Sequence, residues 1–290
     1  MFVVTLLTSP KDPVLDPALV HSLRDAMGGG DAVWLAPDEA AEFRVPALPG
    51  NRWEIWDELQ ASGVDMCVQP GKGRRKRLLI ADMDSTMIEQ ECIDELADMA
   101  GVGPHVSEIT ARAMNGELDF EGALRERVAL LKNLPESVIG EVLDSRITLA
   151  PGGRTLVSTM KRDGAETLLV SGGFTAFTAR IASLLGFDRN RANTLLAEDG
   201  RLTGEVAEPI LGRQAKVDAL TEVTAELGLT PGDAIAVGDG ANDLGMLHLA
   251  GSGVALHAKP AVAAECELRI NHGDLTALLY LQGYAKAEFA

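Results

Sequence analysis

The chain has 290 residues, and proteins of this length usually hold about two domains. Its composition, with 46% hydrophobic and 24% charged residues, is that of an ordinary protein able to bury a large core. The net charge of −17 argues against nucleic acids and anionic membranes as partners. Residues 1–77 carry only −2 of this charge. A phosphate-handling site in the acidic remainder would therefore need a divalent cation and nearby Lys or Arg.

The three cysteines, Cys67, Cys92 and Cys266, lack the spacing of a metal or redox motif. We expect reduced, mostly buried thiols. The N-terminal segment lacks the basic region of a signal peptide, and no run approaches the ~18 apolar residues of a membrane helix. These observations predict a cytoplasmic protein.

Residues 1–70 predict a small α/β domain of the ferredoxin-like or ACT-like kind. The expected elements are a strand over 2–7, a helix over 17–27, a strand over 32–35, a helix around 53–59 and a strand over 64–68. Residues 71–77 follow as a linker that contains four basic residues in a row. Such a run can bind nucleic acid, but a solvated linker is the favoured interpretation.

Residues 78–290 predict an α/β domain with a helical insertion. A buried strand over 78–81 is followed by several amphipathic helices with no strand among them, which indicates a cap over about residues 93–150. The cap helices are expected over 93–100, 106–114, 120–131 and 136–143. The remaining elements are a helix over 154–161, a strand over 166–170, a helix over 174–185, a hairpin of 193–197 and 201–206, a helix over 214–227 and a strand over 233–237. This alternation predicts a Rossmann-like, mainly parallel sheet.

Two carboxylates end the strand over 78–81. Asp82 and Asp84 are two residues apart, so in extended backbone both side chains face one side. Ligands of open α/β sheets bind at the carboxyl ends of the strands. One carboxylate can attack as a nucleophile while the other moves protons. The alternative is a polar turn that closes a core strand.

A second acidic turn, Gly238-Asp239-Gly240-Ala241-Asn242-Asp243, ends the strand over 233–237. Mg²⁺ prefers oxygen ligands from one or two carboxylates, together with phosphate and water. Asp239 could supply one carboxylate and Asp82 another. The alternative is a turn without a metal.

A third strand end, Ser171-Gly172-Gly173, opens onto a helix. Its glycines let backbone N–H groups approach an anion, and the helix N-terminus adds partial positive charge. Lys216, near the start of a later helix, could supply the cation that phosphoryl transfer needs. Each signal is weak alone, since glycine pairs and solvated lysines are common.

These four motifs occur in the order found in the haloacid dehalogenase superfamily. The segment Met87-Ile88-Glu89-Gln90-Glu91 and residues 124–131 are similar to the substrate-reading segments of its phosphoserine phosphatase family. The similarity covers about residues 77–284, and residues 1–70 resemble the family's regulatory-type extension only loosely. The resemblance implies Mg²⁺-dependent hydrolysis of O-phospho-L-serine to L-serine and phosphate, the last step of serine biosynthesis.

The resemblance also implies a role for each matching residue. Asp82 would form an aspartyl-phosphate, and Asp84 would be the general acid and base. Mg²⁺ would be held by Asp82, the backbone carbonyl of Asp84 and Asp239, with Asp243 supporting the metal shell. Substrate would be bound by Ser171, Gly172, Lys216 and Asn242 at its phosphoryl end, by Glu91 and Arg127 at its amino and carboxylate groups, and by Met114 and Phe120 in the cap.

Two alternatives stay open. The same chemistry could act on another small phosphomonoester, or transfer the phosphoryl group to another alcohol such as homoserine. The chain could instead be a non-catalytic amino-acid sensor, although a pure binder has no use for Asp84 as an acid and base. The expected partner is thus a small-molecule substrate, O-phospho-L-serine. We expect no nucleic acid and no membrane as partners, and a homodimer is left open.

Overall fold

The computed structural model of the chain describes residues 1–114 and 117–290. It divides into two compact units. The first comprises residues 1–80, 150–167 and 220–290, and the second comprises residues 81–149 and 168–219. The expected domain ranges of 1–70, 71–77 and 78–290 do not coincide with these units and stay a prediction.

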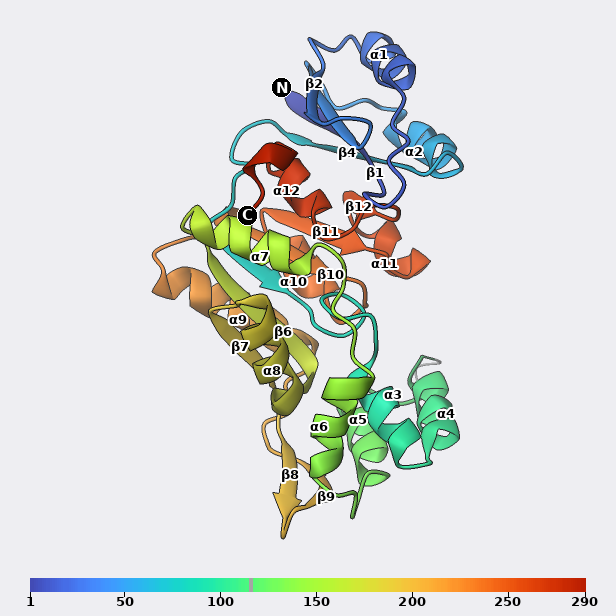
Figure 1. Cartoon of the computed structure of the whole chain (residues 1–290), viewed down its shortest axis with the longest axis vertical. Helices are drawn as coiled ribbons and strands as arrows, with labels where there is room; N and C mark the ends of the chain where they lie inside the picture. The colour runs from blue at the N-terminus through green and yellow to red at the C-terminus, as the bar shows by residue number, and fades with distance from the viewer. Residues whose placement is uncertain (115–116) are drawn as a thin grey trace. The chain divides into compact units, whose positions relative to one another are not determined.

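The first unit begins with a four-stranded antiparallel sheet and two helices (Figure 1). Its elements are β1 (Phe2–Thr8), α1 (Pro17–Ala26), β2 (Val33–Ala36), β3 (Ala40–Val45), α2 (Arg52–Gln60) and β4 (Val64–Pro70). The strand order is β2-β3-β1-β4. This β-α-β-β-α-β chain order with β1 and β3 in the centre is ferredoxin-like, as predicted. Strand β3 was not predicted.

Strand β3 escaped prediction because its residues have low intrinsic preference for strands. Its sequence is Ala-Ala-Glu-Phe-Arg-Val, and only Phe43 and Val45 are typical strand residues. Its central place between β2 and β1 decides its conformation, since both of its edges are paired. Ala40, Ala41 and Phe43 are almost fully buried.

A buried carboxylate holds this small sheet against the C-terminal part of the same unit. Asp65 of β4 is 0% exposed and accepts hydrogen bonds from the backbone N–H groups of Asn271, His272 and Gly273, each at 2.9 Å. Burial raises the pKa of Asp65, while these three donors lower it; the net shift is upward. Three donors on one carboxylate fix the turn after β12 against β4.

Two arginines of the basic run before β5 make contacts within the first unit. The Arg74 side chain is only 10% exposed and forms two hydrogen bonds with the Glu42 carboxylate. The Arg75 guanidinium lies 3.5 Å from the centre of the Tyr284 ring and pairs with Glu288 at 2.9 Å. These side chains are occupied within the first unit, because β3 and the C-terminal segment supply the opposite charges.

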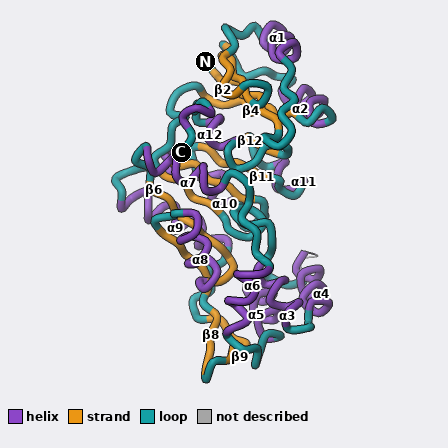
Figure 2. Tube along the Cα trace, viewed as in Figure 1, coloured by secondary structure: helices purple, strands orange, loops and turns teal. Residues whose placement is uncertain are grey.

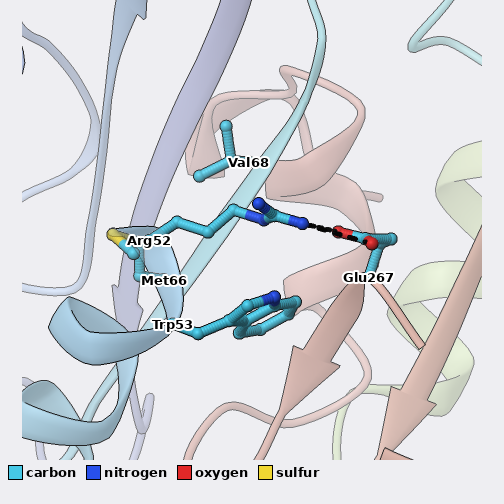
Figure 3. A pocket seen from close by; sticks show the side chains of 5 residues that line it. All are labelled: Arg52, Trp53, Met66, Val68 and Glu267. Carbon is cyan, nitrogen blue, oxygen red and sulfur yellow. Dashed lines mark hydrogen bonds and ion pairs between the residues drawn. The ribbon is translucent and has the colours of Figure 1, made fainter. Parts of the chain in front are cut away.

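Arg52 also forms an ion pair within the first unit (Figure 3). Its guanidinium pairs with Glu267 at 3.1 Å, beside the ring of Trp53. With Met66 and Val68 these residues line a cavity of about 10 Å³, which is room for about one water molecule. We therefore regard it as a packing defect rather than a ligand site.

The larger sheet has six strands in the order β12-β11-β10-β5-β6-β7 and is mainly parallel, as predicted. In chain order, the strands of this sheet and the helices that alternate with them are β5 (Leu78–Ala81), α7 (Gly153–Arg162), β6 (Glu166–Phe174), α8 (Thr175–Leu185), β7 (Arg189–Asn193), α9 (Arg213–Glu226), β10 (Ala234–Gly238), α10 (Leu244–Leu249), β11 (Ser252–Leu256), α11 (Pro260–Ala264), β12 (Leu268–Ile270) and α12 (Ala277–Leu281). Strands β5 and β10 are buried along their whole length.

The second unit contains a cluster of four helices, drawn in green in Figure 1 and in purple in Figure 2. They are α3 (Cys92–Met99), α4 (Gly103–Met114), α5 (Phe120–Ala129) and α6 (Ser137–Ser145). Asp119 caps α5 by accepting from the Gly122 N–H at 2.7 Å. The helical insertion after β5 is therefore confirmed.

A two-stranded antiparallel sheet completes this unit. It consists of β8 (Leu195–Glu198) and β9 (Arg201–Val206), joined where Asp199 and Gly200 both have positive φ. The predicted hairpin is confirmed, but Asn193 belongs to β7, which pairs in parallel with β6.

Among the described residues, no helix has both the length and the apolar character that a membrane-spanning helix needs.

Candidate functional site

In the second unit, Asp82 forms a buried ion pair. The four buried residues of β5 lead directly into Asp82, whose carboxylate Oδ1 lies 2.6 Å from the Nζ of Lys216 in α9. The exposed fractions of the two side chains are 7% and 2%. The Met83 N–H donates to the same carboxylate at 2.8 Å. A cation and an N–H donor both favour the ionised carboxylate, which is the form that can act as a nucleophile.

Asp84 is held by hydrogen bonds on both of its oxygens. Its Oδ1 accepts from the backbone N–H of Cys92 at 2.9 Å, and its Oδ2 accepts from the Ser171 hydroxyl at 2.8 Å. The Ser171 Oγ in turn accepts from the Gly173 N–H at 2.8 Å. A Cβ at Gly173 would lie 2.8 Å from the Asp84 Oδ2, so a larger residue there would displace the Asp84 carboxylate. The first and third motifs therefore meet.

The turn between Asp84 and α3 is tight. Ser85 has φ of 54°, in the left-handed region that residues other than glycine seldom adopt. The N–H groups of Met87 and Ile88 return to the Met83 carbonyl at 2.9 and 3.1 Å. The Ser85 hydroxyl donates to the Glu91 Oε1 at 2.7 Å. The turn thus carries Glu91 back toward the carboxylates of the first motif.

Arg127 of α5 lies within electrostatic reach of three acidic residues of the second unit, Asp94, Glu91 and Asp84. Its Nε donates to the Ala123 carbonyl at 3.2 Å. Burial lowers the pKa of Arg127, while the charges of Asp94, Glu91 and Asp84 partly restore it. Burial likewise raises the pKa of Asp94, and Arg127 opposes that rise. Glu91 and Arg127 therefore lie within electrostatic reach of each other.

Phe120 packs against two glycines from separate segments. A Cβ added to Gly172 would lie 3.0 Å from the Phe120 Cζ, and one added to Gly212 would lie 3.2 Å from its Cδ1. The ring therefore lies over Gly172, the glycine expected to bind the phosphoryl group, and over Gly212. Met114 is the last residue of α4, and its side chain lies outside the described residues.

In the first unit, the acidic turn follows β10. Asp243 is fully buried, and its Oδ2 accepts from the Gly240 N–H at 3.0 Å. Asp239 is 9% exposed, and its carbonyl accepts from the Lys259 N–H at 3.4 Å. Asn242 lies half-buried in the same turn. The Asp243 carboxylate therefore closes this turn by accepting from a backbone N–H within it.

Three contributions were missed in the sequence. They are the Cys92 N–H that orients Asp84, the Asp94 carboxylate near Arg127, and the Asn193 side chain that contacts Gly172. A backbone donor has no signal in side-chain types. Asp94 and Asn193 are single polar residues in ordinary surroundings, so no motif marks them.

Comparisons with known proteins agree on one family. The model of the haloacid dehalogenase-like hydrolases matches residues 79–248. A phosphoserine phosphatase of Streptomyces coelicolor is 41% identical over 98% of this chain, which covers 71% of that protein.

Solved structures give the same result. A HAD family hydrolase from Salmonella enterica subsp. enterica serovar Typhi superposes with a TM-score of 0.86 at 32% identity, covering 97% of this chain and 98% of the other. A phospho-aspartyl intermediate analogue of a phosphoserine phosphatase superposes with a TM-score of 0.66 at 39% identity, covering 71% of this chain and 98% of the other.

Proposed function

The chain belongs to the haloacid dehalogenase-like hydrolase family, and from that premise we propose that it is a phosphoserine phosphatase. It hydrolyses O-phospho-L-serine to L-serine and phosphate. The observation that carries this proposal is the arrangement of two aspartates on one turn. Asp82 is paired with Lys216, and Asp84 accepts a hydrogen bond from Ser171. One carboxylate is kept ionised and the other is oriented, which suits a nucleophile and a proton carrier.

The proposed reaction uses these residues in two steps. The Asp82 carboxylate attacks phosphorus, and Asp84 gives a proton to the serine oxygen as it leaves. Asp84 then takes a proton from the water that hydrolyses the aspartyl-phosphate. Lys216 and the N–H groups around Ser171 and Gly172 stabilise the charge on the phosphoryl oxygens, and Asn242 contacts the same end of the substrate.

A divalent metal fits the acidic residues of the chain. Strands β5 and β10 are neighbours, and each is followed at its carboxyl end by an aspartate, Asp82 and Asp239. Asp243 adds a third carboxylate in the turn after β10, and carboxylate oxygens are the hard ligands that Mg²⁺ prefers. We assign Mg²⁺ to Asp82, Asp239 and the Asp84 carbonyl, with Asp243 supporting the metal shell. When bound, the ion neutralises charge on the phosphoryl group.

Metal binding has a readout that does not depend on activity. At 100 times its dissociation constant, Mg²⁺ should raise the free energy of unfolding of the metal-free protein by about 2.7 kcal/mol, measured by urea denaturation. Asp239→Asn should lose most of this increment, whereas Asp144→Asn, at an exposed position on α6, should keep it. An unchanged increment in Asp239→Asn would remove Asp239 from the metal site.

Arg127 is the proposed reader of the substrate carboxylate. Hydrogen bonds to charged groups contribute about 1.5–3 kcal/mol, so Arg127→Ala should raise the KM for phosphoserine about 10- to 100-fold. O-Phosphoethanolamine keeps the ammonium but lacks the carboxylate, and its KM should change little. Arg125→Ala is the matched control, because Arg125 is two positions away and pairs with Glu121 and Glu208 instead. Equal losses on both substrates would overturn this assignment.

The test of the function itself is phosphate release across a panel of amino-acid and sugar phosphates with Mg²⁺. Phosphoserine should give the highest kcat/KM. A better sugar phosphate, or appearance of a phosphorylated alcohol when homoserine is added, would favour another phosphomonoester or a transferase. Binding of serine without phosphate release would favour the sensor.

Compartment and assembly are part of the same proposal. The free, buried Cys67, Cys92 and Cys266 suit a reducing compartment, so we place the protein in the cytoplasm. A mass measurement in solution would decide between a monomer and a homodimer.

A further inference from the structure

Asn193 uses its whole side-chain amide in hydrogen bonds. It is the last residue of β7 and only 2% exposed. Its Nδ2 donates to the carbonyls of Gly172 at 2.8 Å and Leu211 at 3.1 Å, and its Oδ1 accepts from the Leu211 N–H at 2.7 Å. A buried amide with three short partners holds two segments in one arrangement.

The first of these contacts reaches Asp84 through a single peptide unit. The carbonyl of Gly172 and the N–H of Gly173 belong to the same planar peptide. That N–H donates to the Ser171 Oγ, and the Ser171 hydroxyl donates to the Asp84 Oδ2, both at 2.8 Å. Each donor–acceptor step polarises the next, so the bonds support one another.

The second contact fixes the segment that precedes Lys216. Leu211 leads into Gly212, whose carbonyl accepts from the Ala215 N–H at 3.1 Å at the start of α9. The ring of Phe120 packs over both Gly172 and Gly212, so it rests on the two segments that Asn193 joins.

We propose that Asn193 is a positioning residue for this site. Through the Gly172–Gly173 peptide it fixes the position of the Ser171 hydroxyl, and through that hydroxyl it orients Asp84. Its hydrogen bonds to Leu211 hold the start of α9 in place. The inference rests on the proposed function, because it takes Asp84 as the acid and base.

Two variants separate this role from simple packing. Asn193→Leu keeps a similar volume but makes no hydrogen bond, and Asn193→Asp keeps the acceptor for Leu211 but turns a carboxylate oxygen toward the Gly172 carbonyl. With phosphoserine and Mg²⁺, both should lower kcat about 10- to 100-fold, as misplacement by an ångström does, with a smaller change in KM. Thr178→Val is the matched control, since it removes a fully buried hydroxyl that bonds to Asn190 and should leave kcat unchanged.

A double-mutant cycle with Ser171→Ala tests the path. If Asn193 acts through Ser171, the double variant with Asn193→Leu should lose little more kcat than Ser171→Ala alone. Losses that multiply fully, or an unchanged kcat in both folded Asn193 variants, would overturn the inference. If Asn193→Leu does not fold, the cycle is run with Asn193→Asp. Absence of phosphate release by the wild-type chain would instead refute the proposed function.

Discussion

Asp82→Asn should abolish phosphate release by the folded protein. A neutral amide is a poor nucleophile for phosphorus, so the step that creates the aspartyl-phosphate is lost. Removal of the nucleophile from a covalent catalyst costs roughly 10⁶-fold in kcat, and we expect a loss of that order. The measurement is kcat with phosphoserine, together with acid quenching of labelled substrate to detect phosphate bound to protein.

The matched control is Asp65→Asn. Asp65 is also a buried aspartate held by backbone N–H groups, but its partners are in the turn after β12. Its replacement should lower the free energy of unfolding and leave kcat of the folded fraction near the wild-type value. Label on Asp84 instead of Asp82, or more than about one hundredth of the wild-type kcat in Asp82→Asn, would contradict the mechanism.

Much of the fold could be predicted because its signals are local. The cap helices follow from apolar spacing, and strands β5 and β10 follow from short buried runs that end in aspartate. The same local pattern placed Asp82, Asp84 and Asp239 at strand ends. Their positions need only the direction of a strand and the turn that follows it.

What could not be predicted depends on residues far apart in the sequence. Strand β3 has a sequence of low strand preference, and the burial of Arg74 depends on Glu42, which lies on that strand. Because β3 was not predicted, the ion pair between Arg74 and Glu42 was not predicted either, and the basic run was expected to be solvated. The role of Asn193 is of the same kind, since its partners, Gly172 and Leu211, lie on segments that only the fold brings together.

Lys216→Met should weaken both activity and stability. Lys216 is 2% exposed and lies 2.6 Å from the Asp82 carboxylate, so methionine of similar length leaves that carboxylate buried without its cation. Removal of one partner of a buried ion pair costs about 3–5 kcal/mol in the free energy of unfolding. Loss of one charge-stabilising group in an active site lowers kcat about 10²- to 10³-fold, and we expect at least that loss.

The control is Lys286→Met. Lys286 also pairs with a buried carboxylate, that of Glu39, but its own side chain is 53% exposed, so water can replace it. It should lose less stability than Lys216→Met and keep its kcat.

The double variant Asp82→Asn with Lys216→Met gives the decisive comparison. It removes both charges together, so its free energy of unfolding should exceed that of either single variant, while phosphate release stays absent. Stability losses that simply add would mean that the two groups do not depend on each other. Recovery of stability without activity would show that the chain maintains this buried pair at a cost to folding because the reaction requires both members.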